Sequence, residues 1–82
     1  MNATDSMITE RIATIEVATG RMMSEVTELF YACNNDTGIS ADNDGSQEMI
    51  EALQALQAAQ KAMRLAIAKR KAAQATTAHK VA

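Results

Sequence analysis

Residues 34–45 read NNDTGISADNDG, and this stretch decides how the chain folds. Asparagine, aspartate, glycine and serine dominate it, and these residues favour turns because they tolerate unusual backbone angles or bond their own backbone. The stretch holds two of the three glycines of a chain that has no proline. It is therefore the one clear break in the sequence, and we predict a connecting loop here between two helical segments.

The segments on either side of this loop are predicted to form long helices, at about 5–33 and about 46–76. Asp5 or Ser6 can cap the start of the first helix. The second segment is rich in alanine, glutamine, leucine, glutamate, lysine and methionine, which are the strongest helix formers. Two long helices joined by one short loop predict an antiparallel pair.

We predict that residues 1–82 form a single all-α domain, an antiparallel helical hairpin with frayed ends at 1–4 and 77–82. Apolar residues make up 48% of the sequence, but 17 residues are alanine, and Phe30 and Tyr31 are the only aromatic residues. A core built from so few large side chains is thin, and domains of this size usually need a disulfide, a metal or a partner chain. A single cysteine excludes an intramolecular disulfide, so we expect a partner chain to supply the missing stability.

Apolar residues recur in both predicted helices at alternating spacings of three and four, the pattern of helices packed in a bundle. The row in the first helix is Ile8, Ile12, Ile15, Thr19, Met22, Val26, Leu29 and Cys33. The row in the second helix is Met49, Leu53, Leu56, Gln60, Met63 and Ile67. We predict that the two rows face each other, which places Thr19 opposite Gln60. A buried hydrogen bond between these two residues would fix the helix register, and the alternative is that one or both turn toward solvent.

Both helices carry a second row beside the first. On the first helix this row is Ala13, Gly20, Met23 and Phe30, and on the second it is Ala52, Ala55, Ala59, Ala62, Ala66 and Ala73. A hairpin has only one interface between its own helices, so the second rows need another partner. We predict a homodimer that forms a four-helix bundle. The alternative is a groove that accepts a helix of a different protein.

The composition indicates a cytoplasmic setting. A lone cysteine beside six methionines is typical of a reducing compartment. The first residues, MNATDS, lack the basic region of a signal peptide, and no apolar run approaches the roughly 18 residues of a membrane span. We therefore expect a cytoplasmic protein that has neither a signal peptide nor a membrane segment.

The acidic loop has some features of a calcium site. With Gly45 at the sixth position it resembles a calcium-binding loop of the EF-hand kind, whose ligand positions would be Ser40, Asp42, Asp44, Ser46, Glu48 and Glu51. Two departures oppose this interpretation, because the first position normally holds aspartate and Gln47 stands where a β-branched apolar residue is usual. We favour the alternative that the segment starts the second helix, with Asp44 or Ser46 as its cap. No metal and no cofactor is expected.

The sequence gives little support for catalysis. His79, the only histidine, lies in the end predicted to fray, and Cys33 has no histidine near it in the sequence to activate its thiol. Glycine-rich phosphate loops and clusters of histidine are absent from the sequence. We therefore expect a protein that is not an enzyme.

Charge is distributed unevenly along the chain. Residues 1–52 hold all ten acids and two bases, whereas residues 53–82 hold six bases and no acid. The bases able to contact a phosphate backbone are Lys61, Arg64, Lys69, Arg70 and Lys71. An antiparallel hairpin places them beside Asp5, Glu10 and Glu16, which neutralise much of this charge, and no aromatic stacking surface accompanies them. A small regulator that binds RNA or DNA through this half of the second helix is therefore the alternative function.

Soft and aromatic side chains gather toward the loop end of the first helix, at Met22, Met23, Phe30 and Tyr31. Methionine and tyrosine are common anchors at adaptable protein interfaces. The alternative is that these residues fill the dimer core, except Tyr31, which belongs to neither apolar row. We predict a protein-binding module that acts as an adaptor, inhibitor or regulator, a profile that proteins of mobile elements often share.

Overall fold

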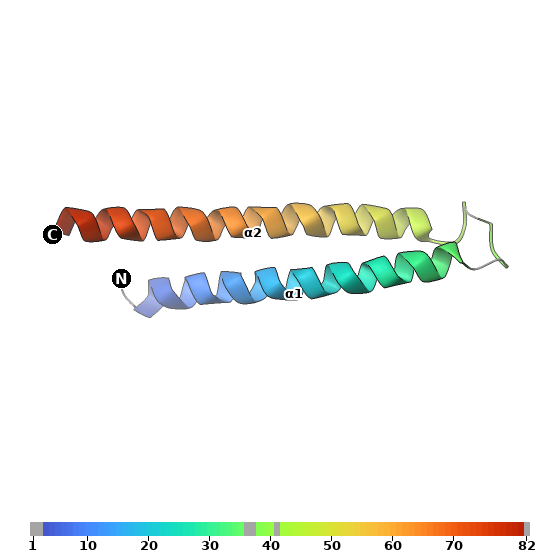
Figure 1. Ribbon diagram of the computed structural model, residues 1–82, viewed down its shortest axis with the longest axis horizontal. Helices are drawn as coiled ribbons and strands as arrows, with labels where there is room; N and C mark the ends of the chain where they lie inside the picture. Colours follow the sequence, from blue (N-terminus) through green and yellow to red (C-terminus); the bar gives the residue numbers. More distant parts are fainter. Residues whose placement is uncertain (1–2, 36–37, 41, 82) are drawn as a thin grey trace.

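The computed structural model describes residues 3–35, 38–40 and 42–81, which form two antiparallel helices lying side by side (Figure 1). α1 spans Ala3–Asn34 and α2 spans Ser46–Val81. Together they make a rod of 66 × 16 × 13 Å. The predicted all-α hairpin is confirmed. Of the residues predicted to fray, 3–4 and 77–81 are helical, because α1 begins at Ala3 and α2 continues past its predicted end at Thr76. Residues 1–2 and 82 lie outside the described residues.

The start of α2 is set by a capping carboxylate and a glycine. Asp44 Oδ1 accepts a hydrogen bond of 2.8 Å from the Ser46 amide, and the Met49 amide donates to the Gly45 carbonyl at 3.1 Å. Gly45 has a φ of 84°, in the left-handed region that side chains with a Cβ rarely adopt. Gly45 therefore occupies the N-cap position, and the Asp44 side chain caps the first amide of α2. Asp44 is one of the two capping candidates predicted from the sequence.

The threonines of α1 are accommodated by bonds within the helix. The hydroxyls of Thr9, Thr14, Thr19 and Thr27 each donate to the carbonyl four residues earlier, over 2.7 to 3.0 Å. This arrangement satisfies a polar side chain without a partner on α2. It allows a threonine to lie on the face that α2 covers.

The inner face of α2, the side turned toward α1, is the predicted one. Its six predicted residues, from Met49 to Ile67, are all half-buried. The row extends beyond them. Arg70 and Gln74 continue it at the same spacing and are also half-buried. The inner face of α2 therefore ends in polar residues.

The inner face of α1 differs from the prediction. It consists of Asp5, Thr9, Ile12, Glu16, Thr19, Met23, Val26, Phe30 and Cys33, all half-buried or buried. Ile15, Met22 and Leu29, which we predicted to face α2, are instead 54%, 45% and 54% exposed. Met23 and Phe30, which we predicted to lie beside the inner face, are part of it. The prediction was right for Ile12, Thr19, Val26 and Cys33. It was wrong for the residues between them, which it placed one position too early.

The contacts between the helices explain this rotation of α1. A Cβ on Gly20 would lie 3.1 Å from Nε2 of Gln60, so the absence of a side chain lets the helices approach closely there. Glu16 and Asp5 also turn toward α2, where they pair with Arg64 and Arg70. Turning Ile15 inward would move these polar groups off the interface. Close approach and charge pairing thus favour the row that contains Glu16.

Thr19 and Gln60 lie at the same level of the two helices, as predicted. The predicted hydrogen bond between them does not form. The Thr19 hydroxyl donates to the Ile15 carbonyl at 2.7 Å, and Nε2 of Gln60 donates to the Glu16 carbonyl at 3.4 Å. Thr19 is only 3% exposed. Both polar side chains therefore bond the backbone of α1, and the register is fixed through that backbone.

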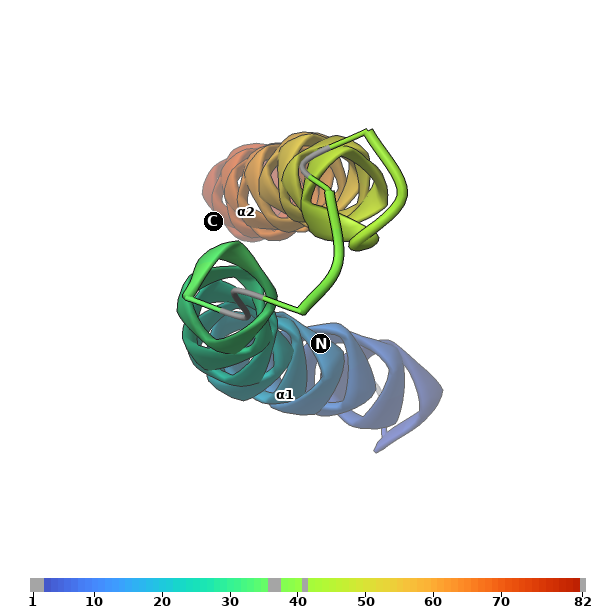
Figure 2. The same ribbon diagram turned by 90° about the vertical axis from the view of Figure 1, so that its right-hand side faces the viewer.

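Two helices alone do not enclose a core. Among the described residues no apolar side chain is buried, and the only buried residues are Thr19 and Ser46. Figure 2, which views the rod from its loop end, shows one layer of two helices that cross rather than run parallel. Both long sides of this layer are open.

Candidate interaction surfaces

One long side of the hairpin is apolar along its length. It is formed by the residues that directly precede inner-face positions on each helix, and in an antiparallel pair these two rows lie on the same side. They are Ile8, Ile15, Met22 and Leu29 on α1, and Ala52, Ala59, Ala66 and Ala73 on α2. We call these eight residues the apolar flank. Sequence reasoning recognised both rows but assigned the α1 row to the hairpin's own interface.

The opposite long side is mostly polar. It is formed by the residues that directly follow inner-face positions: Ser6, Ala13, Gly20 and Thr27 on α1, and Ile50, Gln57, Arg64 and Lys71 on α2. We call these eight residues the polar flank. Its one large apolar side chain, Ile50, is half-buried. The two sides of one hairpin therefore differ sharply in chemistry.

The apolar flank is accessible. Ile15, Met22 and Leu29 are about half exposed, whereas Ile8 is half-buried. The alanines beside them on α2 have small side chains, so the large side chains of α1 project above a strip of methyl groups. This relief suits another helix, whose side chains can enter the space above the alanines.

The four residues predicted to contact a partner protein do not share one surface. Met22 lies on the apolar flank, and Met23 and Phe30 lie on the inner face. Tyr31 is 60% exposed, outside both flanks, and packs edge-on against Phe30 with ring centroids 5.5 Å apart. Only Met22 and Tyr31 are therefore accessible to a partner in the single chain.

The five basic residues of α2 are also divided. Lys61, Arg64 and Lys71 point to the side of the polar flank, because positions three and ten residues apart fall on one side of a helix. Lys69 lies on the other side of α2, and Arg70 lies on the inner face. The bases thus form no continuous stripe.

Two of these bases pair within the hairpin. Nε of Arg64 lies 2.5 Å from Oε1 of Glu16, whose side chain is only 17% exposed. Arg70 donates to Oδ1 of Asp5 at 3.3 Å and to the Thr9 hydroxyl at 3.2 Å. The predicted neutralisation of the basic end is confirmed for Asp5 and Glu16. These pairs were also a signal for the rotation of α1, since both acids match a base of α2 in one antiparallel register.

No protein-family model, curated protein or solved structure matches the chain. The surfaces are therefore interpreted from their own chemistry.

The acidic loop acts as a helix cap in the described structure. The hydrogen bond from Ser46 to the Asp44 carboxylate lowers the pKa of Asp44 from its ordinary value of 3.8. Among the described residues no three histidine, cysteine, aspartate or glutamate side chains gather as they would around a metal ion. The capping bond accounts for Asp44 without a cation.

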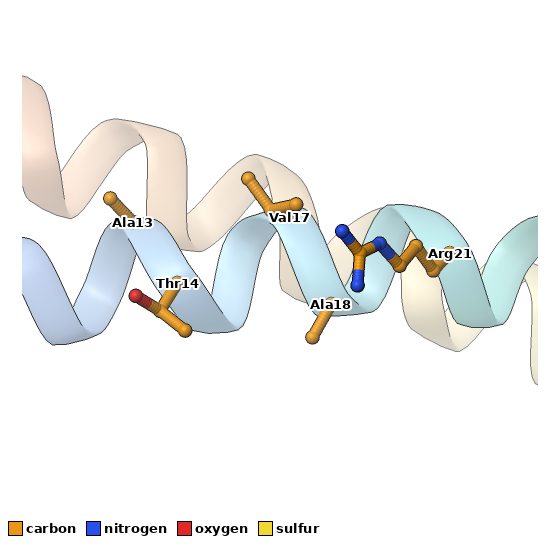
Figure 3. A pocket seen from close by; sticks show the side chains of 5 residues that line it. All are labelled: Ala13, Thr14, Val17, Ala18 and Arg21. Atoms are coloured by element: carbon orange, nitrogen blue, oxygen red, sulfur yellow. The ribbon is translucent and has the colours of Figure 1, made fainter.

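A shallow depression lies on the outer side of α1. Figure 3 shows its five lining residues, all from α1, with α2 passing behind: Ala13, Thr14, Val17, Ala18 and Arg21. Because a single helix supplies every wall, the depression cannot enclose a small molecule. Across the described residues, neither helix contains a window long and apolar enough to cross a membrane.

Proposed function

We propose that this chain is a non-enzymatic protein-binding module, an adaptor, inhibitor or regulator, that works in the cytoplasm as a homodimeric four-helix bundle. The observation that carries this proposal is the apolar flank, where Ile15, Met22 and Leu29 are about half exposed in the single chain. A contiguous exposed apolar surface on a small chain is typical of an interaction site. Heptad spacing along a helix indicates that the partner presents helices.

A second copy of the hairpin supplies such helices. Burying the exposed half of an isoleucine, methionine or leucine stabilises by about 1 kcal/mol. Three such residues from each copy then contribute on the order of 6 kcal/mol, before the entropy cost of association. The single hairpin has no buried apolar side chain among its described residues. Dimerisation thus gives the chain a core that one copy lacks.

The surface proposed for a different protein is the one around Tyr31. This side chain is 60% exposed, and both flanks leave it accessible. Tyrosine often anchors interfaces because it offers apolar area and a hydroxyl at low entropy cost. A bundle that buries its apolar flanks still presents Tyr31 to another protein.

Sedimentation equilibrium at micromolar concentration tests the bundle. We expect twice the mass of the 8.8 kDa chain. Leu29→Asp should convert the dimer to monomer, whereas Leu65→Asp should leave it intact. The two leucines are matched, since they are 54% and 55% exposed, but only Leu29 lies on the apolar flank. A cooperatively folding monomer, or equal effects of the two variants, would overturn the proposal.

Cross-linking in the host lysate tests the partner surface. A photoreactive group at Tyr31 should capture one dominant protein, and the same group at Thr14, which is also exposed on α1, should not. Tyr31→Ala should weaken binding of the captured protein at least tenfold while the dimer mass stays unchanged. Equal capture from both positions would contradict a specific surface at Tyr31.

Nucleic acid is the second candidate, favoured by the placement of Lys61, Arg64 and Lys71 on one side of α2. Lysine contacts to phosphate are lost as salt rises. If this surface binds RNA or DNA, Lys61→Gln with Lys71→Gln should abolish a salt-dependent shift of a mixed nucleic acid, and Lys69→Gln should not. No shift at 50 mM salt would remove this candidate.

A further inference from the structure

The hairpin is electrically polar along its long axis. Its midpoint lies near residues 18 and 61, which sit at the same level of the two helices. The described acids of the half that contains the loop are Glu25, Glu28, Asp42, Asp44, Glu48 and Glu51, against the single base Arg21. The other half holds three acids against Arg11, Lys61, Arg64, Lys69, Arg70 and Lys71. One end of the rod is therefore acidic and the other is basic.

The side of the rod that carries the apolar flank is comparable in size to a standard interface. At 66 × 16 Å it measures on the order of 1,000 Å², compared with about 800 Å² per partner in a standard interface. The flank residues cover about half of this length, since Ile8 and Leu29 lie 21 residues apart at 1.5 Å per residue. A second copy can cover this side in two symmetric ways. Its loop lies either beside the first copy's loop or at the opposite end of the rod.

The number of large side chains in each layer does not distinguish these orientations. Large residues lie on α1 and alanines on α2, so either arrangement places two large and two small side chains at each level of the bundle. With the loops at the same end, α1 stacks on α2 of the other copy, so large residues lie over alanines. With the loops at opposite ends, α1 stacks on α1 and α2 on α2, so large residues lie over large residues and alanines over alanines.

Charge distinguishes the two orientations. Loops at the same end bring six described acids of one copy beside six of the other, and like charges repel within about a Debye length. Loops at opposite ends bring each acidic half beside a basic half. Surface charges contribute little to affinity, but they are effective in selecting the orientation of two partners in an interface.

We infer that a second copy of this chain docks on the apolar flank in antiparallel orientation, so that each loop lies beside the basic, open end of the other hairpin. This inference rests on the proposed self-association and adds its orientation. The symmetry axis then crosses the rod near its middle. Each end of the bundle holds one loop and one open end.

Spin-label distances test the orientation. The lone cysteine is first removed by Cys33→Ala, and a nitroxide is attached to Gln47→Cys in the first turns of α2 or to Ala75→Cys near its other end, both exposed sites. Each site lies about 20 Å from the midpoint at 1.5 Å per residue, so double electron–electron resonance should give about 40 Å for either label alone. An equal mixture of the two labelled proteins should add a short distance, below about 25 Å, from adjacent helices.

Each alternative has its own signature. A distance below about 25 Å for Gln47→Cys alone would overturn the antiparallel orientation but leave the proposed dimer standing. The absence of any distance between labels at concentrations above micromolar would overturn both. The Cys33→Ala parent must show the same sedimentation as the native chain. Raising salt to 1 M should make the short distance of the mixed sample less dominant, because screening removes the charge preference.

Discussion

The two flanks of this hairpin are formed by the same two helices, yet they differ in chemistry and in their contacts. On the apolar flank, Ile15, Met22 and Leu29 project beside alanines and touch nothing that buries them. On the polar flank, Gly20 lets α2 come close, and Arg64 pairs with Glu16. Charge and close approach orient the pair of helices, whereas the strongest apolar surface remains exposed. The contacts of the polar flank, which has few large side chains, thus determine that the apolar flank remains exposed.

The largest expected effect tests whether the apolar flank differs from the rest of α1. Ile15 and Val17 are both β-branched and are 54% and 53% exposed. If the proposed dimer forms, Ile15→Asp should place an unpaired charge in its interface and destabilise the fold by about 3–5 kcal/mol. Val17→Asp, on the outer side of the helix, should change stability by less than about 0.5 kcal/mol. Urea denaturation at a fixed micromolar concentration measures both, and similar losses would show that the flank has no special role.

A smaller effect tests close approach on the polar flank. Gly20→Leu places a side chain where Gln60 already lies, and overpacking of this kind costs about 1–3 kcal/mol, partly offset by better helix propensity. Ala13→Leu, one heptad earlier at an exposed position, should change stability by less than about 0.5 kcal/mol. Thermal melts followed by circular dichroism compare the two. If Gly20→Leu raises the Tm above that of Ala13→Leu, the helices are not in close contact at this point.

The charge pair of the polar flank should contribute less than packing does. A double-mutant cycle of Glu16→Gln and Arg64→Gln should give a coupling of about 0.5 kcal/mol, since the Arg64 side chain is 66% exposed. The coupling should fall in 1 M salt. The cycle of Glu16→Gln with Lys69→Gln is the control and should give none. A coupling above about 2 kcal/mol would mean that charge, rather than Gly20, dominates the polar flank.

The smallest effect concerns the loop that joins the two helices. The pKa of Asp44 is lowered by its hydrogen bond to Ser46, so the charged carboxylate stabilises the folded chain. This stabilisation is fully present above the unfolded pKa of 3.8 and is lost as pH falls through the lower folded value. Asp44→Asn should therefore lower the Tm slightly at pH 6, and the difference should shrink as the pH falls below 3.8. Asp42→Asn is the matched control, and an equal pH response from it would exclude the cap as the cause.

The loop and α2 were predictable from sequence because their signals do not compete. Residues 34–45 contain turn formers almost throughout, and α2 has one row of large apolar residues beside one row of alanines. Size alone therefore shows which row of α2 faces inward. The same reasoning placed the cap of α2 at Asp44 or Ser46 but did not choose between them.

The inner face of α1 was not predictable from apolar spacing. Ile15 and Glu16 belong to adjacent rows that both keep the heptad spacing, and the row of Ile15 is the more apolar one. The choice depends on residues of α2 that lie forty or more positions away, where Gln60 meets Gly20 and Arg64 meets Glu16. A search for acids and bases in a common antiparallel register would have found this face. Spacing within a single helix carries no such information.

The exposed Tyr31 lies near one end of a long, stiff rod. In an antiparallel bundle its two copies point from opposite halves, about 40 Å apart at 1.5 Å per residue. Such a particle is bivalent with a fixed spacing. A partner with two matching sites at that distance would gain avidity from a raised effective concentration, while single-site partners would be held apart. The length of the helices would then act as a ruler between two bound molecules.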